Sequence, residues 1–577
     1  MKIYRKLFAL LFLTISFGST AEEIREFYTE PGLHPFKSPI ESINELIDPF
    51  GGTLQLRHTD VSLPGNGGLE IKVTRFYTNP QLPIGWYNGV MGLGWTMHFG
   101  RVVVPIDHAD KVCNQENYSV HTADNPSIEY ADGARELLVL STDADGALVT
   151  KSNWRVTCLQ DGTGFLAKAP NGMHYLMDEQ ASVDGEISWF TTKISAPRGN
   201  FIRVSYIGNF GYSYIDKVEG FTSAGEADGR TVQFTYATDA SGCKLLDHIE
   251  ANGQVWTYMF DPAPGFSAGA CKFALVSVGM PEGMSWNYDY LGDLGGVTAG
   301  DFSLQRVIYP YGGEVNYTYQ PVHFDEQSAI KTSAISTKST SGPGVSPGIW
   351  SYTFYPGGSI DVPTADLTVV TGPHGKTEYV HQGYTATGFG NTWAMGLLLS
   401  KKLYDASDAL VEQETRYWDK RVISYENYWH GRQGLGAELD TETHSPILKE
   451  VQTWRAGSSF SVIHSLHDSF GNVGRVIEAT NLADEEDRIT DFTYYNDIGE
   501  RWIIGLTEDE VIADGGTNNK KKGLRENLNP FFYGLKKPSP AVSPAQRPLF
   551  VCMKRPRTIT FTRYFYDFLE RRSANHW

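Results

Sequence analysis

Five octapeptides of one pattern decide the fold: GNFIRVSY at 199–206, GRTVQFTY at 229–236, GQVWTYMF at 253–260, GMSWNYDY at 283–290 and GGEVNYTY at 312–319. In each, a glycine is followed five residues later by a β-branched or aromatic residue and seven residues later by Tyr or Phe. The glycines are 30, 24, 30 and 29 residues apart, a period that indicates a repeat architecture. Large residues two apart lie on one face of a strand, and glycine favours the turn before it. Each unit therefore predicts a strand, a glycine turn and a second strand.

An apolar pair precedes the glycine in three of these units. The pairs are Leu246 with Ile249, Leu275 with Val278, and Leu304 with Val307. Degraded copies of the unit, without the second aromatic residue, begin at Gly375 and Gly471. An ordinary β-rich domain with many hairpins is the alternative, since hairpin turns favour glycine in any case.

The composition agrees with strands and turns. The chain has 577 residues, of which 13% are aromatic, 20% are charged and 59 are glycine. This length predicts two to four domains and a sizeable core. Aromatic residues favour strands, and the low charged fraction argues against disorder. We therefore predict an all-β fold in which repeated β-hairpins form one continuous curved sheet.

The N-terminus has the pattern of a secretory signal. Lys2, Arg5 and Lys6 precede a largely apolar run at 7–17, and small residues end at Ala21, where we expect cleavage. An uncleaved membrane anchor is the alternative, for which this run is short. No later apolar run could span a bilayer. We expect a mature chain that lacks a transmembrane segment and is secreted, periplasmic or held at the cell surface.

Charge is unevenly distributed along the chain. Of the total of −18, residues 1–21 carry +3 and residues 515–577 carry +10, which leaves −31 for residues 22–514. Phosphate contacts need clustered cations, so the acidic body argues against nucleic acid as its partner. The same charge favours the solubility of a large exported protein.

Export would allow disulfides among the five cysteines. Proximity in sequence favours pairing Cys113 with Cys158 and Cys243 with Cys271, which leaves Cys552 over. Buried free thiols are the alternative. No pair of cysteines has the spacing of a metal site.

Changes in composition divide the chain into segments. We expect a signal peptide at 1–21, a leader at 22–45, an N-terminal β domain at 46–195, hairpin repeats at 196–331, a β-rich repeat-like region at 349–514 and a basic tail at 515–577. The Ser-, Thr-, Gly- and Pro-rich stretch 332–348 predicts an exposed loop or a boundary. The tail has six prolines and no repeat, which favours a disordered or non-native end.

The N-terminal β domain contains the sharpest strand patterns. Apolar and polar residues alternate at 54–56 and at 69–73, on either side of a turn at 63–68. A third alternating strand is predicted to follow Gly94 and to reach Phe99.

Motifs of catalysis are weak. Gly-x-Ser-x-Gly occurs around Ser267 and Ser346, but a nucleophile elbow needs a strand before it and a helix after it, and both serines lie in loop-like sequence. The triplet Gly-Lys-Thr at 375–377 resembles the end of a phosphate loop whose leading glycine is replaced by Val370. We therefore predict no catalytic residue, no cofactor-binding residue and no cofactor.

Metal-binding patterns are equally weak. Neither His-x-x-x-His nor His-Glu-x-x-His occurs among the 15 histidines. His464 and His467 are three residues apart, in a sequence typical of a strand and turn. The stretch 143–146 begins like a calcium loop, but its glycine comes too early, so a hairpin turn is favoured. We predict no metal site.

Several tryptophans could stack on sugars, although such residues more often pack within sheets. They are Trp350, Trp393, Trp418, Trp429 and Trp454.

The order of several motifs carries a resemblance. Residues 47–69 read IDPFGGTLQLRHTDVSLPGNGGL and are followed by RFY at 75–77 and GLGW at 92–95. YPYGG at 309–313 and HDSFGN at 467–472 come later. Over roughly residues 45–510 the chain resembles the N-terminal regions of RHS/YD-repeat proteins, a bacterial family that includes toxin-complex subunits and polymorphic toxins.

The resemblance implies a partial RHS-like shell, in which hairpins form a wall that encloses a C-terminal toxic polypeptide. It also implies a toxin polypeptide or a toxin-complex subunit as partner. The long array of strict YD repeats and the aspartate-based self-cleavage region of toxin members have no counterpart here. The chain is therefore expected to correspond to the N-terminal part of such a protein.

Our leading hypothesis is a secreted, non-enzymatic, RHS/YD-repeat-like β-shell protein, the N-terminal part of a scaffold that encapsulates or delivers a toxin. The alternative is a cell-surface β module that binds carbohydrate or protein. A third hypothesis is a secreted hydrolase that uses Ser267 or a carboxylate.

Overall fold

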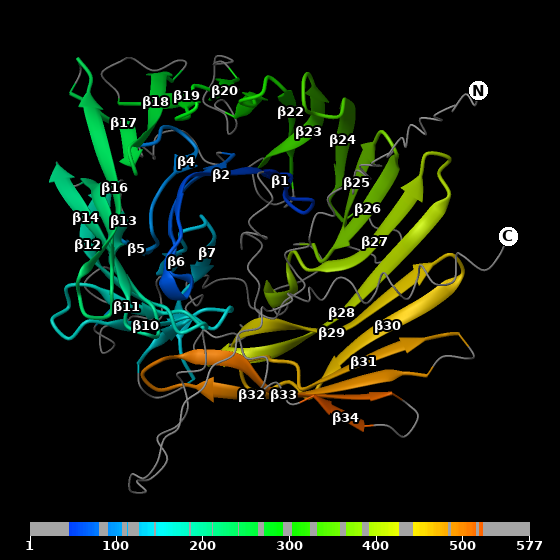
Figure 1. Cartoon of the computed structure of the whole chain (residues 1–577). Coiled ribbons are helices and arrows are strands. Elements are labelled where there is room, and N and C mark those ends of the chain that lie inside the picture. The colour runs from blue at the N-terminus through cyan, green and yellow to red at the C-terminus, as the bar shows by residue number, and fades with distance from the viewer. Residues whose placement is uncertain are drawn as a thin grey trace, which may run out of the picture. The chain divides into compact units, whose positions relative to one another are not determined.

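The computed structural model describes residues 45–79, 90–106, 112–113, 126–142, 146–183, 186–209, 212–240, 242–263, 271–291, 303–323, 332–357, 365–383, 392–425, 442–482, 486–514 and 519–522. The chain divides into two compact units, Met1–Asn527 and Leu528–Trp577, and every described residue belongs to the first. The structure is almost entirely β (Figure 1), which confirms the predicted fold class.

Four strands form a small antiparallel sheet, which we call sheet A, in the order β1-β2-β3-β4. They are β1 (Glu45–Ile47), β2 (Leu54–Leu63), β3 (Ile71–Thr78) and β4 (Trp95–Thr96). The predicted alternation is present in β2, where Leu54 and Leu56 are buried and Gln55 is half-buried. The turn predicted at 63–68 contains a short 3-10 helix, η1 (Asn66–Gly68). The strand predicted to reach Phe99 is shorter than expected, because pairing ends at Thr96.

All remaining strands belong to one long antiparallel sheet, which we call sheet B. Its first strands are β5 (Arg101–Pro105), β6 (Ser127–Glu129), β7 (Arg135–Leu137), β8 (Val139–Leu140), β9 (Leu148–Val149), β10 (Arg155–Cys158), β11 (Phe165–Lys168), β12 (His174–Val183) and β13 (Glu186–Ser195).

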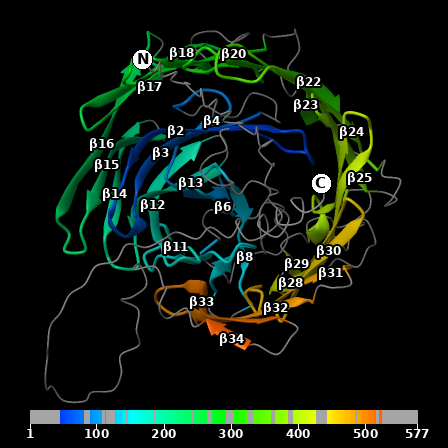
Figure 2. The ribbon, with the colours of Figure 1, turned by 45° about the vertical axis from the view of Figure 1, so that its right-hand side comes forward.

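From β14 onward, sheet B is a succession of antiparallel neighbours in chain order (Figures 1 and 2). The strands are β14 (Phe201–Asn209), β15 (Tyr212–Phe221), β16 (Ala227–Thr238), β17 (Lys244–Ala251), β18 (Gln254–Pro262), β19 (Phe273–Gly279), β20 (Ser285–Tyr290), β21 (Leu304–Ile308), β22 (Glu314–Val322), β23 (Thr332–Ser341), β24 (Gly348–Tyr355), β25 (Asp366–Gly372), β26 (Gly375–His381), β27 (Leu398–Asp405), β28 (Leu410–Ser424), β29 (Thr443–Arg455), β30 (Ser458–Ser465), β31 (Arg475–Thr480), β32 (Arg488–Asp497), β33 (Ile503–Asp514) and β34 (Asn519–Lys522), with one 3-10 helix, η5 (Thr392–Ala394).

Sheet B branches at β13. One edge of β13 pairs with β12, while the other pairs with β5 over Glu186–Phe190 and with β14 over Lys193–Ser195. Among the described residues no ladder joins β7 to β8 or β34 to β5, so the sheet is curved but not closed. The strands β5 to β13 surround their own apolar core, which includes Val102, Val156 and Phe165.

The predicted hairpin units are present. Gly199, Gly253, Gly283 and Gly312 lie in turns with φ of 92°, 74°, 81° and 89°, a region that glycine adopts without strain. Gly229 is different: it lies inside β16, and the turn glycine of its unit is Gly225. The first large residue of each unit is buried, and the second packs against the same core from a partly buried position.

A β-bulge recurs at the second aromatic residue of every unit. The register shifts at Tyr206, Tyr236, Phe260, Tyr290 and Tyr319, where the following strand carries one extra residue. The four tyrosines each donate a hydrogen bond from the hydroxyl to a backbone carbonyl of the preceding strand, at 2.7 to 2.8 Å.

The bulge also explains the apolar pairs. Leu246 and Ile249 are both buried, although residues three apart point to opposite faces of a regular strand. Tyr236 is opposite Leu246 and Thr235 is opposite His248, so Asp247 is the extra residue. This insertion returns both apolar side chains to one face.

Sheet A packs against strands β13 to β24 of sheet B through one shared apolar core. Figures 1 and 2 show sheet A on the inner side of the curve that these strands form. Backbone hydrogen bonds join the two sheets, from Ile335 to Gly52 at 2.9 Å and from Leu93 to Phe273 at 2.8 Å. A side chain at Gly52 would meet Ala334, because its Cβ would lie 2.4 Å from the Ala334 Cβ.

The far end of sheet B meets its beginning. Trp502 donates to the carbonyl of Asn153 at 2.7 Å, Asn153 donates to the carbonyl of Phe470 at 3.0 Å, and Arg421 donates to the Asn153 Oδ1 at 2.6 Å. An isolated bridge joins Asn171 to Ile503. These contacts hold residues more than 260 positions apart in sequence side by side.

Both predicted disulfides are confirmed. Cys113 is bonded to Cys158 and Cys243 to Cys271, across 45 and 28 residues.

One expectation about a segment boundary is corrected. The stretch 332–348 is not a loop throughout, because β23 occupies Thr332–Ser341 and buries Ser333, Ala334 and Ile335. Threonine is β-branched and suits a strand, and this favoured pairing over the turn-like composition. Within 515–577 the structure describes only β34, which pairs with β33, so the prediction for the tail as a whole is not tested.

Other predictions lie outside the described residues. These are the signal peptide, the leader up to residue 44, the motif around Ser267, the acidic positions 143–145, Trp429 and the tail after residue 522. Within the part that the structure describes, no helix has the length and apolarity needed to cross a membrane.

Candidate functional site

The described chain brings together none of the weak catalytic motifs. Ser346 lies exposed in the turn between β23 and β24. The Gly-Lys-Thr triplet at 375–377 begins strand β26, and its backbone pairs with β27, so it forms no phosphate loop. His464 lies near the end of strand β30 and His467 follows that strand, in line with the predicted strand and turn, and no group of three or more His, Cys, Asp or Glu side chains within the described ranges could hold a metal ion.

Three of the tryptophans considered for sugar stacking pack against apolar cores, the role favoured for them. Trp350 lies against the core shared by the two sheets, while Trp393 and Trp418 lie against a smaller core around Leu398. Trp418 also donates to the Leu398 carbonyl at 2.8 Å. These are the ordinary roles of aromatic residues in a sheet.

A cavity of 220 Å³ lies in the N-terminal part of sheet B. It is bordered by Gly100 just before β5, by Glu129 at the end of β6, by the turn that follows β6, by the turn before β10, and by Tyr175 and Met177 of β12. Three aromatic rings follow one another on its wall. The ring centroids of Tyr130 and Trp154 are 4.6 Å apart, and those of Trp154 and Tyr175 are 5.1 Å apart.

Turn chemistry positions this wall. The amide of Gly133 donates to the Tyr130 carbonyl at 2.9 Å, and Gly133 has φ of 82°. The amide of Ala134 donates to the Asp132 Oδ1 at 3.1 Å, which places that carboxylate at the cavity. The turn before Trp154 is closed by the amide of Asn153, which donates to the Thr150 carbonyl at 3.1 Å.

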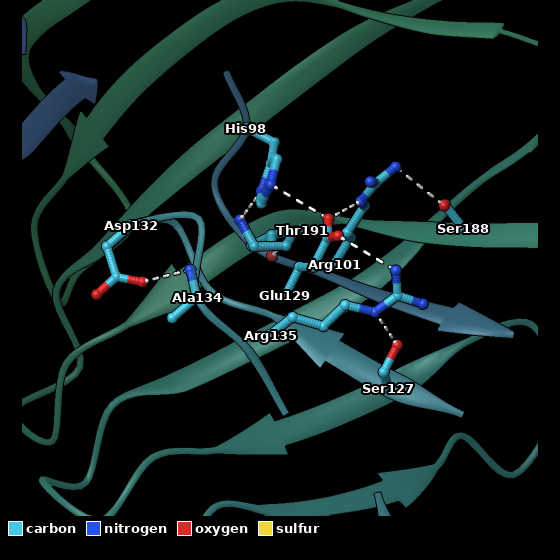
Figure 3. Close-up of polar contacts among 10 residues, drawn as sticks. His98, Arg101, Ser127, Glu129, Asp132, Ala134, Arg135, Ser188 and Thr191 are labelled. Carbon is cyan, nitrogen blue, oxygen red and sulfur yellow. Dashed lines mark hydrogen bonds and ion pairs between the residues drawn. The ribbon is translucent and has the colours of Figure 1, made fainter. Parts of the chain in front are cut away.

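A polar cluster adjoins the cavity at Glu129 (Figure 3). The Nε of Arg101 lies 2.5 Å from the Glu129 Oε2, and an Nη of Arg135 lies 3.8 Å from the Oε1. Arg101 also donates to Ser188 at 3.2 Å and Arg135 to Ser127 at 2.8 Å. The two cations neutralise Glu129 and hold it in one position.

His98 completes this cluster. The amide of Gly100 donates to its Nδ1 at 3.0 Å, so the proton of the neutral ring is on Nε2, which lies 3.5 Å from the Glu129 Oε2. Burial and the charge of Arg101 lower the pKa of His98 to about 4, although Glu129 opposes them.

The same charges act on Glu129. Burial alone would raise its pKa, but Arg101, His98 and Arg135 lower it to about 2. At neutral pH the carboxylate is therefore an anion and the imidazole is neutral with both nitrogens engaged. Such groups accept and donate hydrogen bonds to a ligand or neighbour and are poorly placed to transfer protons.

A second polar site lies between the two sheets. Arg75 of β3 is fully buried, and its Nε lies 3.0 and 2.9 Å from the two carboxylate oxygens of Asp60. Tyr258 donates to the same carboxylate at 2.7 Å, and Arg75 donates to the hydroxyl of Tyr288. The guanidinium also lies 5.2 Å from the Trp95 ring.

This second site joins the two groups of motifs found in the sequence. Asp60, Arg75 and Trp95 belong to the N-terminal motifs, whereas Tyr258 and Tyr288 are the first aromatic residues of two hairpin units. Burial raises the pKa of Tyr288 to about 12, against the opposing effect of Arg75, so its hydroxyl stays neutral. The cluster is a fixed polar connection between sheet A and sheet B.

Sequence reasoning missed both sites. Nothing in the sequence singles out Trp154 or Tyr175, because the cavity wall is assembled from turns and a strand that are more than 20 residues apart. The one available signal for the second site was an arginine in the middle of the predicted strand at β3, because an arginine is rarely buried without a partner.

The sequence matches no protein-family model and no curated protein. Among solved structures, a chain of the Photorhabdus luminescens Tc holotoxin pore is similar with a TM-score of 0.51 at 9% identity, over 86% of this chain and 47% of that one. A chain of the TcdB2-TccC3-Cdc42 complex gives 0.48 at 9% identity, over 81% and 46%. The N-terminal domain of the effector protein SpvB from Salmonella typhimurium gives 0.22 at 14% identity, over 49% and 98%.

This chain spans about half the length of the holotoxin chain, since the likeness covers 47% of it. At 9% identity the likeness is one of architecture. The described residues thus share the curved, all-β fold of that chain.

Proposed function

We propose that this protein is an exported, non-enzymatic wall that forms the N-terminal part of an RHS/YD-repeat-like shell around a polypeptide cargo. One observation carries the proposal: hairpins follow one another in chain order from β13 to β34, and a bulge recurs at the same position of each unit. Similar architecture in a Tc toxin component supports it. The partner would be a toxin polypeptide or another subunit of a toxin complex.

The proposal rests on two physical features of the sheet: its strand edges are paired and one of its faces is covered. Each strand covers the edge of the one before it, which removes the exposed edges that lead to aggregation. Sheet A covers the inner face of β13 to β24 and buries a continuous apolar core there. A wall built in this way can separate a polypeptide from its surroundings.

Protease protection tests this function. A flexible reporter peptide with several trypsin sites is attached after residue 577, and its digestion is compared with that of the free peptide. We expect slower digestion on the full chain, and a return to the free rate when Asp60→Asn weakens the connection of sheet A. Equal digestion rates on the intact chain and the free peptide would contradict enclosure.

Export and the lack of enzymatic activity need separate measurements. We expect the mature protein recovered from outside the cytoplasm to begin at Glu22. A hydrolase screen is expected to show no activity, and activity that disappears with Ser267→Ala or Ser346→Ala would favour a secreted hydrolase instead.

A further inference from the structure

The two ends of sheet B meet along a seam that lies between two segments of the chain (Figures 1 and 2). One segment is residues 151–174, from the turn before β10 to the start of β12, and the other is residues 421–504, from the end of β28 to the start of β33. Among the described residues a single β-bridge crosses this seam, between Asn171 and Ile503. Strands within one end are paired over many residues, as β28 and β29 are. Far less backbone pairing therefore holds the two ends together than holds either end internally.

Side-chain hydrogen bonds make up most of the seam, and Asn153 lies at their centre. Its side chain donates to the Phe470 carbonyl at 3.0 Å and accepts from Arg421 at 2.6 Å. Its carbonyl accepts from the Trp502 ring at 2.7 Å. Other donors to carbonyls across the seam are Ser445 to Lys151 at 3.2 Å, His174 to Arg501 at 3.2 Å and Lys168 to Gly499 at 3.4 Å. Each such bond contributes little net stability, because water replaces it when the contact opens.

Little apolar surface is buried across the seam. Ile503 packs there against Gly172, which has no side chain and whose Cβ, if added, would lie 3.0 Å from the Ile503 Cγ1. Beside the seam, a small apolar cluster joins Val139 of β8 to Ile423 of β28. Sheet A, by contrast, is joined to β13–β24 through a large apolar core. Because apolar burial is the main stabilising contribution, the seam is the weaker of the two joints.

Arg421 adds a reason for the seam to open. It donates to Asn153 and, at 3.2 Å each, to the carbonyls of Lys151 and Ser469, but no ion pair joins it to a carboxylate of the described residues. Burial lowers the pKa of Arg421 to about 10, although Asp468 opposes this effect. The closed seam thus holds a positive charge largely away from water without an acidic partner. Opening relieves that cost, because water then solvates the guanidinium.

We propose that sheet B opens and closes at this seam, where β28–β33 part from the first strands of the sheet while the ladders within each end stay formed. Regions that bury little apolar surface open at a lower free energy than the whole molecule unfolds. Opening exposes the backbone groups of the seam to solvent, and the amide of Ile504, which donates to the Pro170 carbonyl at 2.8 Å, is one of them. This inference goes beyond the enclosure of a cargo and does not depend on it.

Hydrogen exchange of the native full chain, followed by mass spectrometry, tests the inference. The reporter is the amide of Ile504. The controls are the amides of Ile335 and Leu93, which donate between sheet A and sheet B at 2.9 and 2.8 Å. Each exchange rate is divided by the rate of the same amide in the unfolded chain. We expect Ile504 to exchange about 100-fold faster than both controls, because the seam opens without global unfolding.

Two variants distinguish opening of the seam from global unfolding. Asn153 has φ of 64°, so Asn153→Gly removes its side-chain hydrogen bonds without straining the turn. It destabilises the closed state, from which every opening starts, and should speed exchange at Ile504 by about tenfold and at the controls as well. Asn287→Ala is the matched control, because it removes two side-chain hydrogen bonds within β19 and β20. It destabilises the closed and the open seam equally, so it should speed exchange at the controls but not at Ile504.

Two results would overturn the inference. One is an Ile504 amide in the unchanged protein that is protected as strongly as the controls, and the other is an Ile504 amide that Asn287→Ala accelerates as much as Asn153→Gly does. A variant that does not fold is recognised because the control amides lose their protection altogether. In that case Ser445→Ala, which removes another hydrogen bond of the seam, replaces Asn153→Gly and should accelerate Ile504 in the same way.

Discussion

Removing the charge of Asp60 should weaken the protein more than removing any exposed charge. Arg75 is fully buried and the side chain of Asp60 is 5% exposed, so water cannot replace the lost partner. Two unit charges about 4 Å apart interact by about 4 kcal/mol at an effective dielectric constant of 20. Loss of one member of a buried pair typically costs about 3–5 kcal/mol, and we expect Asp60→Asn to lower the free energy of unfolding by that amount.

Guanidinium chloride unfolding followed by tryptophan fluorescence measures this effect, with Trp95 only 5.2 Å from the guanidinium. Asp419→Asn is the matched control, because Asp419 and Lys449 are both 55% exposed and 3.6 Å apart, and should cost less than about 1 kcal/mol. The double variant Asp60→Leu with Arg75→Met should recover part of the loss, since no buried charge remains unpaired, although the hydroxyls of Tyr258 and Tyr288 lose these partners. The reasoning is refuted if Asp60→Asn costs no more than Asp419→Asn, or if the double variant is as unstable as the single one.

Three further predictions concern stability. Replacing both Cys243 and Cys271 with serine frees a loop of 28 residues and should lower the free energy of unfolding by about 3.5 kcal/mol, while reductant should then have no further effect through this bond. Tyr290→Phe should lower the free energy of unfolding by about 1–3 kcal/mol in the same denaturation assay, because the Tyr290 hydroxyl accepts from Trp95 at 2.8 Å and donates to the Leu275 carbonyl at 2.8 Å. One such hydrogen bond contributes at least about 0.5 kcal/mol, so a smaller loss would argue that the hydrogen bond at the bulge does not stabilise the fold. The folded-state pKa of His98, about 4, lies below its unfolded value of 6.5, so the unfolded chain binds the proton first as pH falls. His98 should therefore lower the free energy of unfolding by about 2 kcal/mol between pH 7 and pH 5, and His98→Asn should lack this contribution. If the free energy of unfolding depends on pH in the same way in the variant and in the unchanged protein, His98 makes no such contribution.

The repeated unit could be predicted because its determinants are local. A glycine with positive φ and two large residues on one strand face lie within eight residues of each other, as at Gly283 to Tyr290. The disulfides could be predicted for a similar reason, since each joins cysteines that are neighbours in sequence. The all-β fold follows from repetition of these local signals.

Contacts between segments that are distant in sequence could not be predicted from local patterns. The partners of Arg75 include Tyr258 and Tyr288, which lie some 200 residues away, and no spacing rule relates them. The cavity wall likewise combines Tyr130, Trp154 and Tyr175 from separate turns and strands. These neighbours are decided by how the sheets pack, which depends on the whole chain.

Two local features of the sequence indicate more than its composition does. The spacing of three between Leu246 and Ile249, repeated in neighbouring units, is incompatible with one face of a regular strand and indicates a bulge. The Ser-, Thr-, Gly- and Pro-rich composition of 332–348 predicts a loop or a boundary, but its threonines lie within strand β23, where Ile335 is buried.

The recurrent bulge has an evolutionary consequence. Because each unit contains its own bend, a tandem duplication of one segment of about thirty residues would add a correctly curved piece without any compensating change elsewhere. Descendants of one ancestral unit could thus differ in length while keeping a common radius.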